Sequence, residues 1–217
     1  VSCVLFYCCR SYSEGSFKPD VSTHGSPRRT IVLTLSETSL HLFKHSLVRL
    51  AQSCVQLAVS SEEAVTAKAT ARGKPASTVP HIKYLLLRAR SVSLLYGPSS
   101  VAPPADIAQR LEDAVQLGKD SQLVADCPSD EVHAWATLAI AQQLAGADAS
   151  VVMEAYLNAI GCSRKIPLDE VKQDRDAIVP LGLFVQTAKL LLLAGRFRQA
   201  RTILLYACSV YSSASLF

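Results

Sequence analysis

Apolar residues recur along most of this chain at spacings of three and four positions, which is the period of an α-helix. The first such stretch can be capped by Ser36 or Thr38 and extends to about Val59. Its apolar positions are Leu40, Phe43, Leu47, Leu50, Val55 and Leu57. An alanine-rich stretch over residues 62–72 also permits a helix before glycine and proline break the pattern. The pattern therefore predicts two helical stretches ahead of residue 73.

Six further helices are predicted between glycine and proline breaks, and they span about 81–96, 105–125, 131–144, 150–160, 182–193 and 197–211. Pro104 favours a helix start, because a residue in the first turn needs no partner for its N–H. A shorter helix begins near Leu168 and stops by Pro180, after a polar connection over residues 161–170. The best strand candidate, residues 30–35, is isolated and cannot pair its own backbone groups. The expected fold class is therefore all-α.

The composition of the chain changes at about residue 30. Residues 10–30 are rich in Ser, Gly, Pro and charge, which is typical of a disordered linker. We therefore assign residues 1–30 to a disordered or partial N-terminal segment and residues 31–217 to one helical-repeat domain. Because the chain opens at Val1 and closes on an apolar stretch, we expect further repeats of the same protein to flank it.

The last two predicted helices form the clearest repeat unit. Its large, small and turn positions are Phe184, Ala188, Leu191, Gly195, Phe197, Ala200, Leu204 and Ala207. A large residue early in the first helix fills the groove against the second, and the alanines at 188 and 200 let the two backbones approach closely. Gly195 suits the tight turn between the helices. Ala207 leaves room for the first helix of a following unit.

Two earlier stretches repeat part of this pattern. In the better copy, the opening large, turn and second-helix positions hold Trp135, Gly146, Tyr156 and Ala159. One residue is inserted in its turn. The weaker copy consists of Leu85, Ala89, Val92, Leu111, Ala114 and Leu117, and its turn is too long for the standard repeat. The clearest repeats therefore cover residues 131–160 and 181–212.

These positions resemble the tetratricopeptide repeat (TPR). Phe184 occupies the tryptophan position, Ala188 the small-residue position, and residues 195–200 the turn signature, whereas Ser212 stands where the family usually has proline. The resemblance implies antiparallel helix pairs stacked as a short solenoid, whose concave groove binds an extended peptide or a helix of a partner protein. The alternative fold is an ordinary helical bundle with small residues at its helix crossings.

A narrower resemblance involves residues 134–139 and the Ala-Cys step at Ala207-Cys208. They resemble the carboxyl-terminal TPR array of the cilia- and flagella-associated protein seventy family. In that family a Pro-Ser turn follows the Ala-Cys step and a tryptophan opens the next repeat, and here Ser212-Ser213 and Phe217 stand in those places. The insert between the two clearest repeats also suits that array. The resemblance implies a structural role in the axoneme of a motile cilium or flagellum.

Composition excludes several classes of function. The net charge is +4, aromatic residues make up 6%, and no run of Lys and Arg is sustained, so nucleic acid is not an expected partner. No apolar run is long enough to cross a bilayer, and no membrane partner is expected. The seven cysteines are odd in number and mostly lie in apolar helical stretches. That pattern is typical of buried thiols in a reducing compartment such as the cytoplasm.

The motifs that could carry chemistry are incomplete. Glu37, His41 and His45 share one helix face, but a zinc site needs a further ligand, and a polar helix face is the simpler interpretation. The charged cluster over residues 169–176 is more typical of a solvated helix face than of an acid–base pair. Trp135 lies inside a helical repeat, where packing is the expected role. We therefore expect no catalytic residue, no cofactor, no metal and no enzymatic activity.

The sequence thus predicts a protein-interaction scaffold of the TPR type. In the predicted register, the groove is lined by first-helix residues that point away from the second helix: Gln142 and Gln143 in one unit, and Gln186 and Lys189 in the next. Their side chains suit hydrogen bonding along a peptide backbone. The alternatives are a helical-bundle adaptor or regulatory domain unrelated to cilia, a spacer between neighbouring repeats, and an all-α enzyme.

Overall fold

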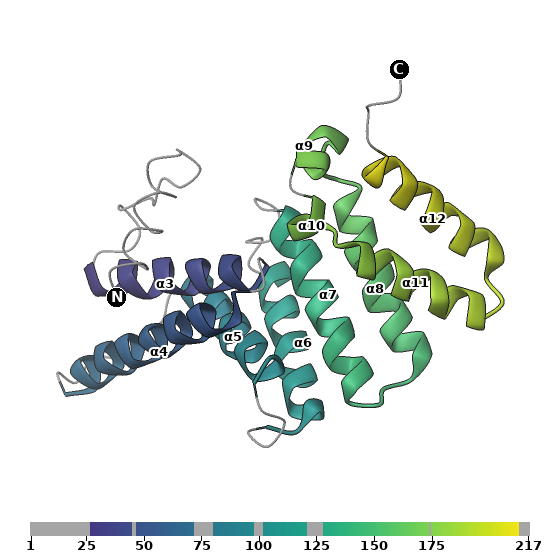
Figure 1. Cartoon of the computed structure of the whole chain (residues 1–217). Coiled ribbons are helices and arrows are strands. Elements are labelled where there is room, and N and C mark those ends of the chain that lie inside the picture. The colour runs from purple at the N-terminus through teal and green to yellow at the C-terminus, as the bar shows by residue number, and fades with distance from the viewer. Residues whose placement is uncertain are drawn as a thin grey trace. The chain divides into compact units, whose positions relative to one another are not determined.

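The structure is a computed structural model of the whole chain, and it describes residues 27–44, 47–71, 80–97, 102–120, 128–173 and 175–212 (Figure 1). Every regular element in these ranges is a helix, which confirms the all-α class for this part of the protein. Residues 1–26 of the N-terminal segment that was predicted to be disordered lie outside the described residues. The first helix among the described residues begins at Pro27, four residues earlier than the domain start expected from composition.

The chain divides into two compact units, residues 1–101 and residues 102–217. The first contains α3 (Pro27–Lys44), α4 (Val48–Thr70) and α5 (Pro80–Leu95). Each of these three helices packs against the other two. The single helical domain expected over residues 31–217 would include parts of both units, and it stays a prediction.

The start of the first unit differs from the prediction in two ways. The strand candidate at residues 30–35 is helical and belongs to α3. The helix expected to run to about Val59 is instead two helices, because α3 ends at Lys44 and α4 starts at Val48. The chain reverses there so that α4 packs against α3, which buries Leu40 and Phe43 and leaves Leu47 and Leu50 partly exposed. The sequence between the two helices contains neither glycine nor proline. The apolar spacing alone therefore could not reveal the turn.

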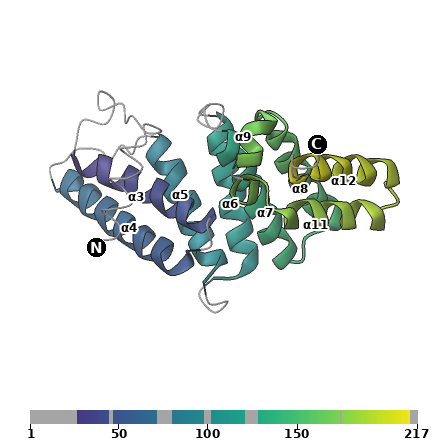
Figure 2. The same cartoon turned by 45° about the horizontal axis from the view of Figure 1, so that its top comes forward.

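The second unit contains α6 (Pro104–Asp120), α7 (Pro128–Leu144), α8 (Ala149–Ser163), α9 (Leu168–Gln173), α10 (Arg175–Ile178), α11 (Leu181–Leu193) and α12 (Phe197–Tyr211). Consecutive long helices pack together in the order α6, α7, α8, α11, α12. Figure 2 shows α11 and α12 side by side, as Figure 1 does from another direction. The weaker predicted repeat drew its helices from α5 and α6, which belong to different units. The described neighbour of α6 is α7.

Proline marks the first residue of several helices. Pro27, Pro80, Pro104 and Pro128 open α3, α5, α6 and α7. Proline is suited to this position because its fixed φ angle is already helical and its missing N–H would have no partner within the helix. Only Pro104 was expected in this role from the sequence.

The core of the second unit's C-terminal half is an apolar cluster that joins α7, α8, α11 and α12. The connection between α8 and α11 also contributes buried side chains to it, at Ile166, Val171 and Val179. The polar connection expected over residues 161–170 is therefore partly core, and α8 itself extends to Ser163. As a result, α9 and α10 are held against the long helices rather than looping into solvent.

Within the described helices, none combines the length and the apolarity that crossing a lipid bilayer requires.

Candidate protein-binding surface

The α7–α8 hairpin has the glycine turn and the buried second-helix residues that were predicted for it. Ala139 and Ala159 are fully buried where the two helices meet. Gly146 in the turn has a φ of 72°, a left-handed conformation that glycine adopts without strain. Tyr156 is buried, and its hydroxyl donates a hydrogen bond to Gln143 Oε1 at 3.2 Å. Local sequence thus sets both the turn and the close approach of the helices.

The α11–α12 hairpin confirms the packing predicted from its small residues. Ala188, Ala200 and Ala207 are all buried. Gly195 has a φ of 71°, so Phe184 and Phe197 lie on separate helices on either side of the turn. Phe184 is 0% exposed, whereas Phe197 is 66% exposed. The two phenylalanines therefore have opposite environments although both belong to the repeat signature.

Aromatic contacts lock the inner side of this hairpin. The Phe184 ring meets Tyr206 and Tyr211 edge to face, with ring centroids 5.6 and 6.4 Å apart. The Tyr211 hydroxyl lies 3.0 Å from both Asp176 Oδ1 and the Val179 carbonyl oxygen, either of which can accept its proton in a hydrogen bond. Burial, and then the hydrogen bond to Asp176, raises the pKa of Tyr211 to about 12. One carboxylate of the charged cluster at 169–176 thus links α12 to α10.

The four predicted groove residues have different environments. Gln142 is only 9% exposed, and its Oε1 atom has no hydrogen-bond partner. Gln143 is exposed and already accepts the bond from Tyr156. Gln186 and Lys189 are exposed on α11. Partner binding at these positions stays a prediction, with Gln142 the least accessible of the four because its helix position turns toward the interior.

Sequence reasoning missed the apolar residues that lie exposed on the same two helices. Ile140 and Leu144 on α7, and Val185 and Leu192 on α11, are each at least one-third exposed. The signal that could have found them is register, because these positions fall off the helical stripe that carries the small buried residues. The outward faces of both first helices are therefore more apolar than the glutamines and lysine suggested.

Trp135 has the packing role expected for it. It is partly buried against the apolar cluster, and Lys119 Nζ of α6 lies 4.4 Å from its ring centroid. That distance is within the range of a cation–π contact. The tryptophan therefore links α6 and α7.

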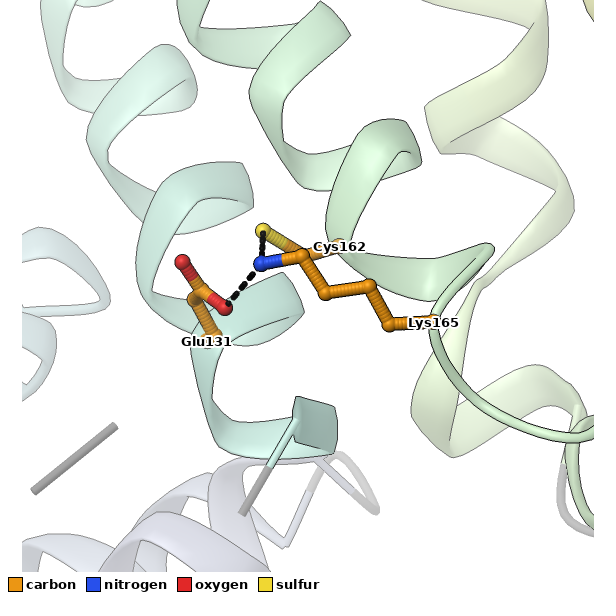
Figure 3. A network of polar contacts seen from close by, with 3 residues as sticks. All are labelled: Glu131, Cys162 and Lys165. Atoms are coloured by element: carbon orange, nitrogen blue, oxygen red, sulfur yellow. Dashed lines mark hydrogen bonds and ion pairs between the residues drawn. The ribbon is translucent and has the colours of Figure 1, made fainter. Parts of the chain in front are cut away.

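A three-residue polar contact joins the start of α7 to the end of α8 (Figure 3). Lys165 Nζ lies 3.1 Å from Glu131 Oε2 and 3.9 Å from Cys162 Sγ. Burial, followed by the neighbouring Glu131 carboxylate, raises the pKa of Cys162 to about 12, so that its thiol stays protonated at neutral pH. Hydrogen bonding to Glu131 raises the pKa of Lys165. This arrangement holds two helices together and offers no activated nucleophile.

The cysteines only partly follow the expected pattern. Cys54 and Cys162 are buried, as small apolar residues would be. Cys208 is exposed on α12, which corrects the expectation for this residue. The reason is its position on the outer face of α12, away from α11.

The first unit contains buried polar side chains that the apolar pattern did not predict. Arg88 on α5 is fully buried, and its Nη1 donates a hydrogen bond to the Tyr84 hydroxyl at 3.2 Å. Ser36 and Ser39 of α3 and Ser91 of α5 are also fully buried. The hydroxyls of Ser39 and Ser91 donate to backbone carbonyls of their own helices. These groups lie inside the unit and are not accessible to a substrate.

The interpretation of Glu37, His41 and His45 as a polar helix face stays a prediction. Glu37 and His41 lie on α3, and His45 falls outside the described residues. Among the side chains that the structure describes, no group of three or more His, Cys, Asp and Glu is placed to hold a metal ion.

No protein-family model matches this chain, and neither a curated protein nor a solved structure matches it. Function is therefore inferred from the surfaces of the two hairpins.

Proposed function

We propose that this protein is a non-catalytic scaffold of the TPR type, which binds other proteins through the outward faces of its stacked helical hairpins. The observation that carries the proposal is the repetition of one packing unit. The hairpins α7–α8 and α11–α12 both have a left-handed glycine turn and buried alanines at the helix crossing. Repeated hairpins of this kind present a continuous surface whose exposed residues are free for binding.

The exposed apolar residues support a protein as the partner. Leu144 on α7 is 60% exposed, and Ile140, Val185 and Leu192 are also exposed. A contiguous apolar patch on a surface is typical of a protein-interaction site, and in our proposal these four side chains belong to one such surface. Gln143, Gln186 and Lys189 supply polar groups near them in sequence, as a peptide-binding groove requires.

The polar clusters support a role without catalysis. Glu131 and Lys165 connect α7 with the end of α8, and Tyr211 connects α12 with Asp176. In each case the partners join neighbouring helices, and the cysteine beside Lys165 is kept protonated. These groups therefore serve packing in our proposal.

A pull-down with the whole chain tests the scaffold. We expect proteins captured from a cell extract to be lost when Leu144→Ser and Val185→Ser are combined, because both exposed side chains lie on the proposed groove. Leu57→Ser is the matched control, since this leucine is similarly exposed but lies on α4. Circular dichroism should show the same helix content in all variants. Capture that is identical for the wild type and the double variant would refute the proposal.

The narrower resemblance extends the proposal to the axoneme of a motile cilium. The Ala-Cys step at Ala207-Cys208 and the opening Trp135 are the residues that support it. A fluorescent fusion expressed in ciliated cells should remain with the axoneme after detergent extraction. A fusion that washes out with the membrane and matrix would leave the scaffold proposal standing and remove its ciliary setting.

A further inference from the structure

The two hairpins can be compared position by position, because their second helices correspond at an offset of 48 residues. On α8, which packs against both α7 and α11, Met153, Tyr156 and Ile160 are buried and Leu157 is partly buried. The corresponding positions on α12 are Arg201, Leu204, Cys208 and Leu205. All four are exposed, with Leu204 at 43% and Leu205 at 59%. The positions that are buried or partly buried on α8 are therefore exposed on α12.

Phe197 extends this open face to the start of the helix. Residues 197, 201, 204 and 208 follow each other at spacings of four, three and four, which places them along one side of α12. We name Phe197, Arg201, Leu204, Leu205 and Cys208 the outer stripe of α12. At its N-terminal end, the turn forms an open hollow lined by Gly195, Arg196, Phe197, Arg198 and Gln199. A helix lying along the outer stripe would cover its apolar residues.

Charge indicates what kind of helix would fit there. Residues 1–176 contain 18 Lys and Arg and 18 Asp and Glu, so the net charge of +4 comes entirely from the remaining residues. These carry Lys189, Arg196, Arg198 and Arg201 and no acidic residue. All four basic side chains are exposed, and none forms an ion pair within the described part of the chain. Arg201 also stands where α8 has the apolar Met153.

We propose that the outer stripe of α12 binds an amphipathic helix of another protein, with carboxylates beside its apolar face. The apolar face would cover Phe197, Leu204 and Leu205. The carboxylates would pair with Arg198 and Arg201, the latter in a bidentate geometry that guanidinium groups favour. The inference rests on the proposed scaffold function and names the chemistry of one partner.

The same features disfavour two other occupants. An anionic membrane would attract the arginines, but Arg201 lies between the apolar positions and would be drawn into the acyl region with them, which is costly for a charged side chain. A second copy of this hairpin would bring the same four positive charges and no carboxylate. A helical partner with acidic residues satisfies both the apolar and the basic positions.

Two synthetic helical peptides test the inference against the whole chain. Both have leucines at alternating spacings of three and four, and they differ only in carrying glutamates or lysines beside the leucines. Fluorescence anisotropy should show at least about tenfold tighter binding of the glutamate peptide, weakening as salt is added. Arg201→Glu should reverse the preference between the two peptides. Leu204→Ser should weaken the binding of the glutamate peptide about tenfold.

Matched controls distinguish binding at the outer stripe from non-specific electrostatic or hydrophobic binding elsewhere on the protein. Arg110→Glu on α6 and Leu57→Ser on α4 change similarly exposed residues elsewhere and should leave binding unchanged. The inference is overturned if both peptides bind equally. It is also overturned if the wild type instead binds phosphatidylserine vesicles through Arg201, or dimerises in light scattering through Leu204. If the combined Leu144→Ser and Val185→Ser variant still loses its captured proteins while the wild type does not bind the glutamate peptide, the scaffold proposal stands and only this inference fails.

Discussion

The α7–α8 and α11–α12 hairpins share one local design and differ in what surrounds them. Both have a left-handed glycine turn, at Gly146 and Gly195, and both bury alanine at the helix crossing. However, α7 packs between α6 and α8, and α8 is covered by α11, whereas α12 contacts α11 and α9 and keeps its outer stripe exposed. Tyr156 is accordingly 3% exposed and its counterpart Leu204 43%.

This difference shows which parts of a repeat are local and which depend on a neighbour. The turn and the small residues serve contacts inside one hairpin, so they look alike in both. The outer face of the second helix is completed only by the element that packs on it next. The comparison can be tested by changing matched positions in the two hairpins and measuring the free energy of unfolding with denaturant.

The largest effect is expected at the opening aromatic positions. Phe184→Ala should lower the free energy of unfolding by about 3–5 kcal/mol, because the ring is fully buried and contacts Tyr206 and Tyr211. Trp135→Ala should cost less, since Trp135 is only partly buried. Val185→Ala, beside Phe184 but exposed, is the control and should have little effect. Equal decreases in the free energy of unfolding for Phe184→Ala and Trp135→Ala would mean that the different burial of these two side chains does not affect stability.

Enlarging the small residues should have the next largest effect. Ala188→Leu and Ala139→Leu should each cost about 1–3 kcal/mol, because both alanines are buried at close helix crossings and a leucine would force the helices apart. Gln186→Leu provides the control, as residue 186 is exposed on α11. An Ala188→Leu variant as stable as the wild type would contradict the close crossing on which the repeat interpretation depends.

The success of the sequence analysis follows the same division between local and neighbour-dependent features. The bounds of α12 and the roles of Gly195 and Ala188 were predicted, because glycine turns and helical spacing are encoded within a few residues. The turn between α3 and α4 was missed, because no glycine or proline lies between the two helices in the sequence. The burial of Arg88 was also missed, because only tertiary packing decides which side of a helix meets a neighbour.

The candidate surface was harder to predict than the fold. Gln142 was expected in the groove and is buried, while the exposed apolar residues of α7 and α11 went unrecognised. Hydrophobic spacing alone does not show which apolar residues are exposed, because the same spacing describes a covered helix such as α8. Their register relative to the small buried residues is the additional signal. Comparing equivalent positions of the two hairpins shows which apolar residues are exposed, and the hydrophobic spacing of a single helix does not.

The turn glycines should give a smaller and nearly equal effect in the two hairpins. Gly195→Ala and Gly146→Ala should each cost about 1–2 kcal/mol, because both glycines have φ near 70° and the added Cβ meets no other atom within 4 Å. The cost is therefore that of the backbone conformation alone. Asn at either position should cost less than Ala, since asparagine tolerates the left-handed region. A much larger loss in one hairpin would show that its turn depends on tertiary contacts.

The smallest effect concerns Tyr211, whose counterpart on α8 is Ser163. At neutral pH Tyr211→Phe should cost about 0.5–1.5 kcal/mol, because the hydrogen bonding to Asp176 and Val179 is lost. The pKa of Tyr211 is raised from 10.0 to about 12, so its contribution is present below pH 10. Above pH 10 the unfolded chain releases the proton before the folded chain does, and the contribution declines up to about pH 12. The difference in stability between wild type and Tyr211→Phe should therefore narrow over this interval in denaturant titrations. A constant difference would mean that the hydroxyl does not hold α12 to α10 and the residue after it, and the inner side of this hairpin would then depend on ring packing alone.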